Sequence, residues 1–348
     1  MSLLPGIAAT SVQTARLRSN VLLRSAAPTG DVSVVFVHGN VSSSLFWQPL
    51  MLDLPPEINA VAVDLRGYGG SEAAPVDATR GLRDWSDDLA EVIDELGLGP
   101  AHLVGWSMGA GVVMQYALDH PARSLTLLSP VSPYGFGGTA LDGSLLTPDA
   151  AGTGGGGANP DFVARLQDGD RSSDSPTSPR TVYATTYVKP GFVSEHEEIW
   201  VDSMLTTATG EDSYPGDATT SKNWPGFAPG ARGVLNTMAP TYLNLSGLVD
   251  LADKPPVLWI HGADDVIVSD TSYFDLNFLG QIGAIPDWPG VEIAPPQPMK
   301  AQTRAVLDAY AANGGRYSEL ALDNCGHSPH LEHPDRVRQA ILDHLALP

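Results

Sequence analysis

Basic residues and cysteine are scarce in this chain of 348 residues. Lysine and arginine together number 19 against 40 aspartates and glutamates, which gives a formal net charge of −21. Such a chain has little with which to neutralise phosphate groups, so nucleic acid and anionic membrane surfaces are poor candidate partners. The single cysteine, Cys325, excludes an intramolecular disulfide and permits a reducing compartment.

Long apolar runs are absent as well. No stretch approaches the roughly 20 apolar residues that a membrane-spanning helix needs. Residues 1–6 lack the basic region and the apolar run of a signal peptide. These absences favour a cytoplasmic location. Hydrophobic residues still make up 43% of the chain, which is enough for the core of an ordinary globular protein.

Both flanks of the chain alternate strand-like with helix-like segments. Apolar runs suited to buried strands lie at 33–37, 58–65, 103–105, 125–128, 257–260 and 320–322. Helical patterns lie at 82–96, 109–120 and 337–345, and an alternating pattern typical of an antiparallel edge hairpin lies at 14–23. This order predicts an α/β fold with a mostly parallel central sheet and helices on both faces.

The middle of the chain is different. Residues 132–253 show little periodicity and are rich in glycine, proline, serine and threonine. A structureless loop of this length is improbable in a compact domain, so we expect an inserted cap, partly helical around 195–207. A lid-like second insertion is expected at 272–298. The core then consists of residues 1–131 and 254–348.

Residues 105–109, Gly-Trp-Ser-Met-Gly, match the G-x-S-x-G pattern of a nucleophile elbow. A predicted strand precedes this motif and a predicted helix follows it, which is the context that the pattern requires. The sharp turn would lift the hydroxyl of Ser107 out of the sheet, with a helix N-terminus behind it to favour developing negative charge. We therefore expect Ser107 to be a nucleophile.

A serine hydroxyl needs a base to take its proton. His327 is the strongest candidate, because it follows the last predicted strand and so lies at the sheet edge where Ser107 also lies. The base in turn needs a carboxylate that fixes its tautomer. Asp264 and Asp265 both follow the penultimate strand, and the residues alone leave the choice between them open.

The reaction also needs donors for an oxyanion. The backbone N–H groups of Met108 and of Asn40, in the loop after the first buried strand, are the candidates. No metal or organic cofactor is required. The candidate substrate contacts are Trp106, Val41, Tyr134, Phe136 and Trp224.

Taken together, these motifs resemble those of the α/β-hydrolase superfamily. The landmarks lie in family order at 38–40, 64–71, 105–109, 261–265 and 326–334. The resemblance covers about 14–131 and 254–346, and the long cap departs from it. In the family the acid usually stands three residues after the glycine of the His-Gly motif, which implies Asp265. Loop 40–47 looks like that of haloalkane dehalogenases and epoxide hydrolases, but their nucleophile is an aspartate.

The resemblance implies hydrolysis of an ester, lactone, thioester, amide or activated C–C bond and does not choose among them. A carboxylic ester or lactone is the first choice, because that is the commonest chemistry for this set of residues. The aromatic residues of the expected cap favour an apolar pocket and a moderately apolar substrate. Two alternatives remain. The same site could cleave a C–C bond, act as a lyase or run a cofactor-free oxygenation. The protein could also be a ligand receptor that keeps a vestigial triad and turns nothing over.

Overall fold

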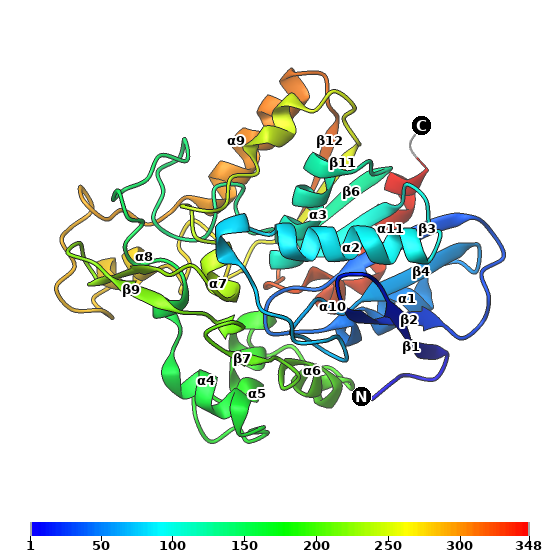
Figure 1. The fold of residues 1–348 in the computed structure, drawn as a ribbon, viewed down its shortest axis with the longest axis horizontal. Coiled ribbons are helices and arrows are strands. Elements are labelled where there is room, and N and C mark those ends of the chain that lie inside the picture. Colours follow the sequence, from blue (N-terminus) through cyan, green and yellow to red (C-terminus); the bar gives the residue numbers. More distant parts are fainter. Residues whose placement is uncertain (1, 347–348) are drawn as a thin grey trace.

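The computed structural model describes residues 2–346, and its centre is an eight-stranded sheet (Figure 1). The strand order is β1-β2-β4-β3-β5-β6-β11-β12. Strand β2 is antiparallel to both of its neighbours, β1 and β4, and the other neighbouring pairs are parallel. The strands are β1 (Ile7–Gln13), β2 (Arg18–Arg24), β3 (Val32–Val37), β4 (Ile58–Val63), β5 (His102–Trp106), β6 (Ser124–Leu128), β11 (Val257–Gly262) and β12 (Tyr317–Leu322). The predicted mostly parallel sheet is therefore confirmed.

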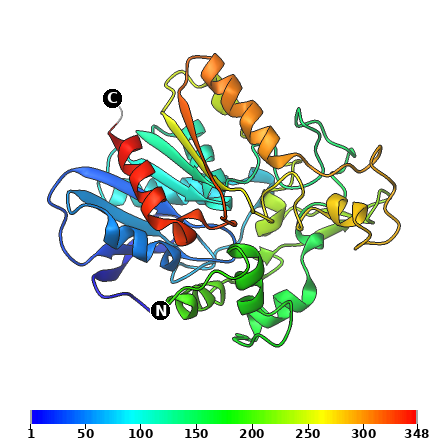
Figure 2. The ribbon, with the colours of Figure 1, turned by 180° about the vertical axis from the view of Figure 1, so that it is seen from behind.

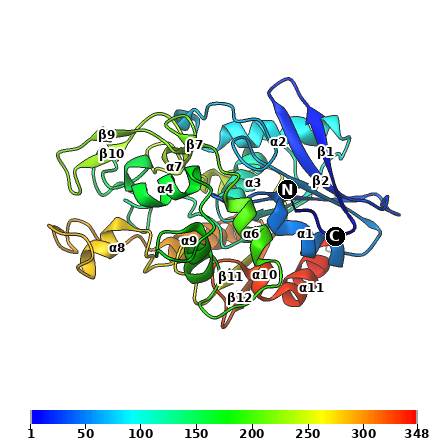
Figure 3. The same ribbon diagram turned by 90° about the horizontal axis from the view of Figure 1, so that it is seen from below.

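The central strands are buried on both faces. Every residue of β5, β6 and β11 is buried, because helices cover the sheet on each side. Figures 1 and 3 show α2 and α3 on one face, and Figures 2 and 3 show α11 on the other, where α1 packs beside it. The helices of the core are α1 (Gln48–Asp53), α2 (Arg83–Glu95), α3 (Met108–Asp119), α9 (Met299–Ala312), α10 (Pro329–Glu332) and α11 (Pro334–Leu345).

The N-terminal hairpin corrects one prediction. The alternating pattern at 14–23 predicts the whole hairpin there, but its strands are Ile7–Gln13 and Arg18–Arg24, and the interval between them is the turn. The hydroxyl of Thr14 donates to the carbonyl of Leu17 at 3.0 Å and closes that turn. The first strand lies at the sheet edge with five of its seven residues exposed, so its sequence carries little hydrophobic pattern.

Most of the segment 132–253, called the cap below, gathers beside one end of the sheet (Figures 1 and 2), whereas its last part, with the turn Ser246–Asp250, packs against α3 and α9. The helix expected around 195–207 is present as α6, but short helices and paired strands also occur where no periodicity indicates them. The elements are α4 (Pro160–Gln167), α5 (Pro179–Val182), a π-helical turn (Tyr183–Tyr187), α6 (Glu197–Met204), α7 (Val234–Thr237), and the strand pairs β7 (Thr209–Gly210) with β8 (Tyr214–Pro215) and β9 (Ala218–Thr220) with β10 (Phe227–Pro229).

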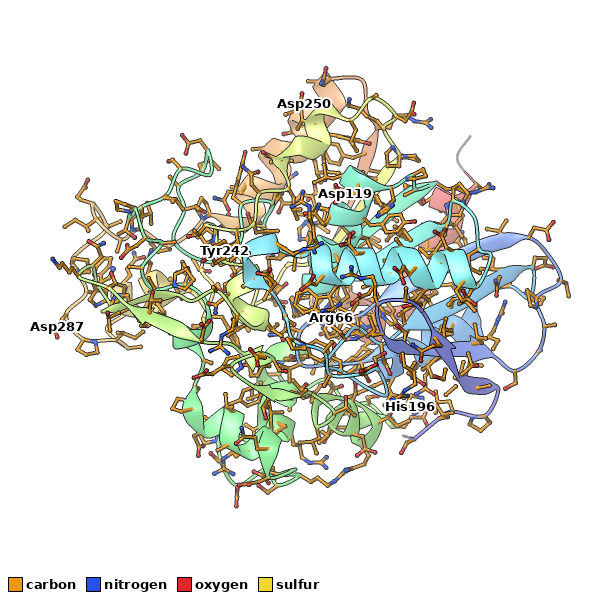
Figure 4. All side chains as sticks on the ribbon, in the orientation of Figure 1. Arg66, Asp119, His196, Tyr242, Asp250 and Asp287 are labelled. Atoms are coloured by element: carbon orange, nitrogen blue, oxygen red, sulfur yellow. The ribbon has the colours of Figure 1, made fainter. Side chains whose placement is uncertain are left out.

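The second insertion carries α8 (Leu276–Gln281) and contacts the cap. The indole N–H of Trp224 in the cap donates to the carbonyl of Pro286 at 3.0 Å. In Figure 4, Asp287 of this insertion lies at the end of the molecule remote from the sheet, whereas Asp119 marks the end of α3. Within residues 2–346, no helix is long and apolar enough to cross a membrane.

Short 3₁₀ turns complete the chain. They lie at Ser44–Trp47, Ala78–Arg80, Gly155–Gly157 and Ser246–Asp250. The turn at Ser44–Trp47 is wholly buried and follows the loop of residues 38–42. That loop is part of the site described next.

Candidate active site

Ser107 stands at the junction of β5 and α3, in a backbone conformation that an L side chain rarely adopts. Its φ is 57° and its ψ is −120°, and a conformation of this kind costs on the order of 1–3 kcal/mol. Backbone hydrogen bonds hold it. The Ser107 N–H donates to the carbonyl of Leu128 at 2.9 Å, and its own carbonyl accepts from Val131 at 3.2 Å. The neighbouring strand β6 thus fixes the elbow.

The glycines of the elbow are needed for close approach. A Cβ on Gly105 would lie 2.4 Å from the carbonyl oxygen of Gly109, and one on Gly109 would lie 2.3 Å from that of His38. Real Cβ atoms do not come this close, so larger residues would push apart the strand, the helix and the loop that starts at His38. The motif therefore brings this loop against the turn that carries Ser107.

His327 lies between β12 and α10 and contacts Asp265. The distance from His327 Nδ1 to Asp265 Oδ2 is 2.8 Å, and both residues are buried. The other oxygen, Asp265 Oδ1, accepts the N–H groups of Ile267 and Val268 at 2.8 and 3.0 Å. Burial alone would raise the pKa of Asp265, but His327 and these amides lower it, and the net direction is downward. The carboxylate therefore stays charged and holds the imidazole with Nε2 free to accept a proton.

The adjacent Asp264 faces elsewhere. Its side chain is exposed and accepts from Nζ of Lys189, in the cap, at 2.9 Å. Of the two aspartates that the residues left in competition, the structure brings Asp265 and not Asp264 to His327.

His38 holds the loop that approaches Ser107. The N–H of Leu65 donates to His38 Nε2 at 3.0 Å, so the proton of the neutral ring is on Nδ1, which lies 2.7 Å from the carbonyl of Gly39. Burial lowers the pKa of His38 to about 4, although Asp64 acts in the opposite direction, and the ring is neutral at pH 7. The Gly39 carbonyl and the Asn40 N–H belong to one planar peptide. The histidine therefore fixes the orientation of that N–H.

Asn40 and Met108 carry the two N–H groups expected to bind an oxyanion, and the next amide along the loop, that of Val41, is bonded to a side chain. The N–H of Val41 donates to its neighbour's side chain, Asn40 Oδ1, at 2.9 Å, and the hydroxyl of Tyr68 donates to the same oxygen at 2.8 Å. Met108 is the first residue of α3, where an N–H has no acceptor within the helix. A Cβ on Gly39 would lie 3.0 Å from Cβ of Ser107, so the loop lies directly beside Ser107.

Ser107, His327 and Asn40 line one cavity of about 450 Å³. The cap and the second insertion supply most of its apolar wall, which includes Phe162, Val182, Leu235, Met238, Leu276 and Leu279. The described residues that line it include no lysine or arginine. The one acidic residue among them is Asp275. Burial raises the pKa of Asp275 to about 6, although the backbone N–H groups of Gln297 and Asn277 lower it.

Three of the five predicted substrate contacts lie on this cavity, namely Val41, Trp106 and Phe136. The other two do not. Tyr134 lines a separate, open groove with Leu141 and Val306, and Trp224 is bonded to the second insertion through its indole, as described above.

Sequence reasoning missed the cavity residues Tyr187 and Phe162, which come from the cap. Tyr187 belongs to a cluster of aromatic residues in an otherwise aperiodic segment. That clustering was the one available signal, and it does not distinguish Tyr187 from its buried neighbours.

Two further histidines follow His327 but do not join it. His330 is buried with its ring 4.4 Å from that of Trp47 and 4.9 Å from that of Trp106, and neither ring nitrogen has a hydrogen-bond partner. His333 Nε2 lies 3.1 Å from the carbonyl of Asn324. Among residues 2–346, no three His, Cys, Asp or Glu side chains are grouped to hold a metal ion.

Comparisons with known proteins agree with this architecture. The chain is 37% identical over 114 residues to the dihydrolipoyllysine-residue acetyltransferase component of the acetoin cleaving system of Cupriavidus necator, covering 33% of this chain and 30% of that protein. It is 34% identical over 125 residues to 2-(acetamidomethylene)succinate hydrolase of Mesorhizobium japonicum, covering 35% and 42%. The chain thus spans less than half the length of these two curated relatives.

The likeness to solved structures extends over the whole chain. An esterase from Exiguobacterium antarcticum superimposes with a TM-score of 0.59 at 16% identity, covering 98% of this chain and 100% of the other. At such low identity this likeness shows the fold alone. The model of the alpha/beta hydrolase family matches residues 34–340, and with the sheet order and the elbow described above, the chain belongs to the alpha/beta hydrolase family.

Proposed function

We propose that this protein is a serine hydrolase that cleaves an uncharged carboxylic ester or lactone through a covalent acyl-enzyme. The observation that carries the proposal is the 2.8 Å contact between His327 Nδ1 and Asp265 Oδ2, in the cavity onto which the elbow presents Ser107. A buried base with a fixed tautomer, a serine on a strained elbow and two amides beside it are the parts that acyl transfer needs.

In the first half of the reaction, His327 Nε2 takes the proton of Ser107 Oγ as this oxygen bonds to the substrate carbonyl carbon. The electron pair of the C=O bond moves to oxygen, and the N–H groups of Asn40 and Met108 stabilise that oxyanion. When the C=O bond re-forms, the bond to the leaving oxygen breaks, and His327 gives its proton to that oxygen. The products are an alcohol and an acyl group on Ser107.

In the second half, water takes the place of the alcohol. His327 removes one proton as the water oxygen bonds to the acyl carbon, the same amides hold the oxyanion, and the bond to Ser107 Oγ breaks as the proton returns to it. The substrate loses its acyl group as a carboxylic acid, and the enzyme is restored.

The cavity wall supports an uncharged, moderately apolar substrate. Carboxylates and phosphates are usually bound by arginine or lysine, and the described lining residues include neither. The relative from Mesorhizobium japonicum is named for a succinate derivative, which is a dicarboxylate. We infer that the substrate of this chain differs from it in charge.

The test is hydrolysis of p-nitrophenyl esters from acetate to octanoate by the purified chain and by Ser107→Ala and His327→Ala. We expect both variants to lose activity while they remain folded. Ser86→Ala is the matched control, because its buried hydroxyl has no hydrogen-bond partner and it lies on α2. Mass spectrometry of the quenched reaction should find the acyl group on Ser107. Full activity in Ser107→Ala would disprove the proposal.

A further inference from the structure

One cap side chain reaches the loop beside the nucleophile. The hydroxyl of Tyr187 donates to the backbone carbonyl of Asn40 at 2.9 Å and lies 3.3 Å from that of Val41. The side chain is buried, and its ring lies 6.4 Å from that of His327 and 5.7 Å from that of Trp106. Burial raises the pKa of Tyr187, so the hydroxyl keeps its proton and acts as a donor.

The two carbonyls that it contacts flank a strained residue. Val41 has a φ of 44°, which is exceptional for a β-branched side chain and persists only where neighbouring contacts hold it. Relaxation of Val41 would turn the Asn40–Val41 peptide, whose carbonyl accepts from Tyr187. That peptide is joined through Cα of Asn40 to the Gly39–Asn40 peptide, which carries the Asn40 N–H, so its rotation would shift this N–H as well. A bond to the carbonyls on both sides of Val41 opposes such a turn.

The position of Tyr187 is fixed by contacts between the following cap residues and the segment around His327. Two residues further on, the N–H of Lys189 donates to Glu332 at 2.9 Å, and the same carboxylate accepts the N–H of Gly326, next to His327, at 3.0 Å. The Lys189 ammonium donates to Asn324 at 2.7 Å. The cap segment 187–189 therefore joins the base loop to the loop beside Ser107.

We propose that Tyr187 is a positioning residue that holds the strained Asn40–Val41 loop in the geometry that binds the oxyanion. This inference rests on the proposed function, because the oxyanion exists only if Ser107 attacks a carbonyl. It also assigns the cap a part in the chemical step, beyond its part in enclosing the substrate.

The test compares Tyr187→Phe with Tyr183→Phe. Tyr183 lies one turn earlier on the same π-helical segment, and its buried hydroxyl has no hydrogen-bond partner. Removal of that hydroxyl in Tyr183→Phe is therefore a matched control. For Tyr187→Phe we expect kcat for nitrophenyl butyrate to fall about 10- to 100-fold with KM changed less than about twofold, because the lost stabilisation belongs to the transition state. A trifluoromethyl ketone, which forms a tetrahedral adduct, should lose affinity by the same factor. Tyr183→Phe should match the wild type in each measurement.

A fluorophosphonate probe separates this inference from the proposal that it rests on. If the wild type and Tyr187→Phe are labelled at Ser107 at equal rates and have equal kcat, the inference is wrong and the serine hydrolase stands. If the wild type is not labelled and hydrolyses none of the esters, both fail. A loss confined to melting temperature, with kcat unchanged, would show a structural role only and would also overturn the inference.

Discussion

The sheet edge and the cap build the same cavity by different means. Ser107, Asp265 and His327 follow strand ends, and ladders of backbone hydrogen bonds set the positions of those ends. The cap and the second insertion have few regular elements, and buried amide side chains join their loops. The comparison teaches that the positions of the three proposed catalytic residues depend on the backbone framework, whereas the shape of the cavity depends on individual polar side chains.

Asn236 is such a side chain. It is fully buried in the cap, its Oδ1 accepts the N–H groups of Gly155 and Gly230, and its Nδ2 donates to the carbonyls of Asp217 and Arg232. One amide thereby connects three segments of the cap, at 155, at 217 and at 230–232. This substitutes for the hydrogen-bond ladder that a sheet would supply.

Gln297 does the same between the two insertions. Its Nε2 donates to the carbonyl of Gly135 at 3.1 Å and to the hydroxyl of Thr139 at 2.9 Å, and its backbone N–H donates to Asp275 at 2.7 Å. The start of the cap is therefore tied to the second insertion next to the cavity.

The largest loss of activity should come from a substitution at one of the residues that follow the strand ends. Asp265→Asn should lower kcat by about 10⁴-fold, because the amide favours the wrong tautomer of His327. The matched variant Asp264→Asn should change kcat less than about threefold, since that side chain is exposed and bonded to Lys189. Steady-state kinetics on nitrophenyl butyrate measure both. A larger loss in Asp264→Asn would show that the acid is assigned to the wrong residue.

A substitution that loosens the cap should alter the selectivity between esters more than it alters the rate of the chemical step. Asn236→Ala leaves several buried backbone groups without partners and should cost about 3 kcal/mol of stability. We expect activity on octanoate to fall more than activity on acetate, as cap loops that shape the cavity loosen. Asn223→Ala, a partly exposed cap asparagine, is the control. Urea unfolding and the ratio of the two activities are the measurements, and an equal loss on both esters would contradict the comparison.

A smaller effect concerns the packing beneath the sheet edge. Burial, and then the neighbouring His327, lower the pKa of His330 to about 3. The folded state keeps the ring neutral, while the unfolded state takes up a proton below pH 6.5, so this histidine's contribution to stability is present above pH 6.5 and is lost as the pH falls toward 3. His330→Phe keeps an aromatic ring at this position and removes the group that takes up a proton on unfolding. Relative to the wild type, its free energy of unfolding should be about 2 kcal/mol higher at pH 5, and the difference should be smaller at pH 8. Equal differences at the two pH values, from urea titrations, would disprove the shift.

The sequence could predict the framework because its physics is local. Buried parallel strands need continuous apolar runs, and five of the predicted runs match β3, β4, β5, β6 and β11 closely. The elbow motif carries its own steric requirement, so Ser107 could be located without a structure. The geometry also agrees with the choice of Asp265 and His327, whose catalytic roles stay predictions until variants are measured.

The rest depends on contacts between segments distant in sequence. The helix Met299–Ala312 was missed, because alanines and polar residues dilute its buried positions Met299, Val306, Leu307 and Tyr310. The cap owes its form to the amide networks of Asn236 and Gln297, which no periodicity records. For the same reason an aromatic residue such as Trp224 gives no sign in the sequence of whether it faces the cavity.

The lack of lysine and arginine among the described lining residues of the cavity would affect the end of a turnover in the proposed hydrolysis. Hydrolysis of an uncharged ester produces a carboxylate anion. In this cavity the anion would find no lysine or arginine among the described lining residues. It would also share the cavity with Asp275, whose pKa of about 6 leaves it ionised at pH 7. Transfer of such an anion from the cavity to water lowers its free energy. Accumulated carboxylate should therefore compete weakly with fresh substrate, and the enclosure that admits an apolar molecule would itself expel the acid made from it.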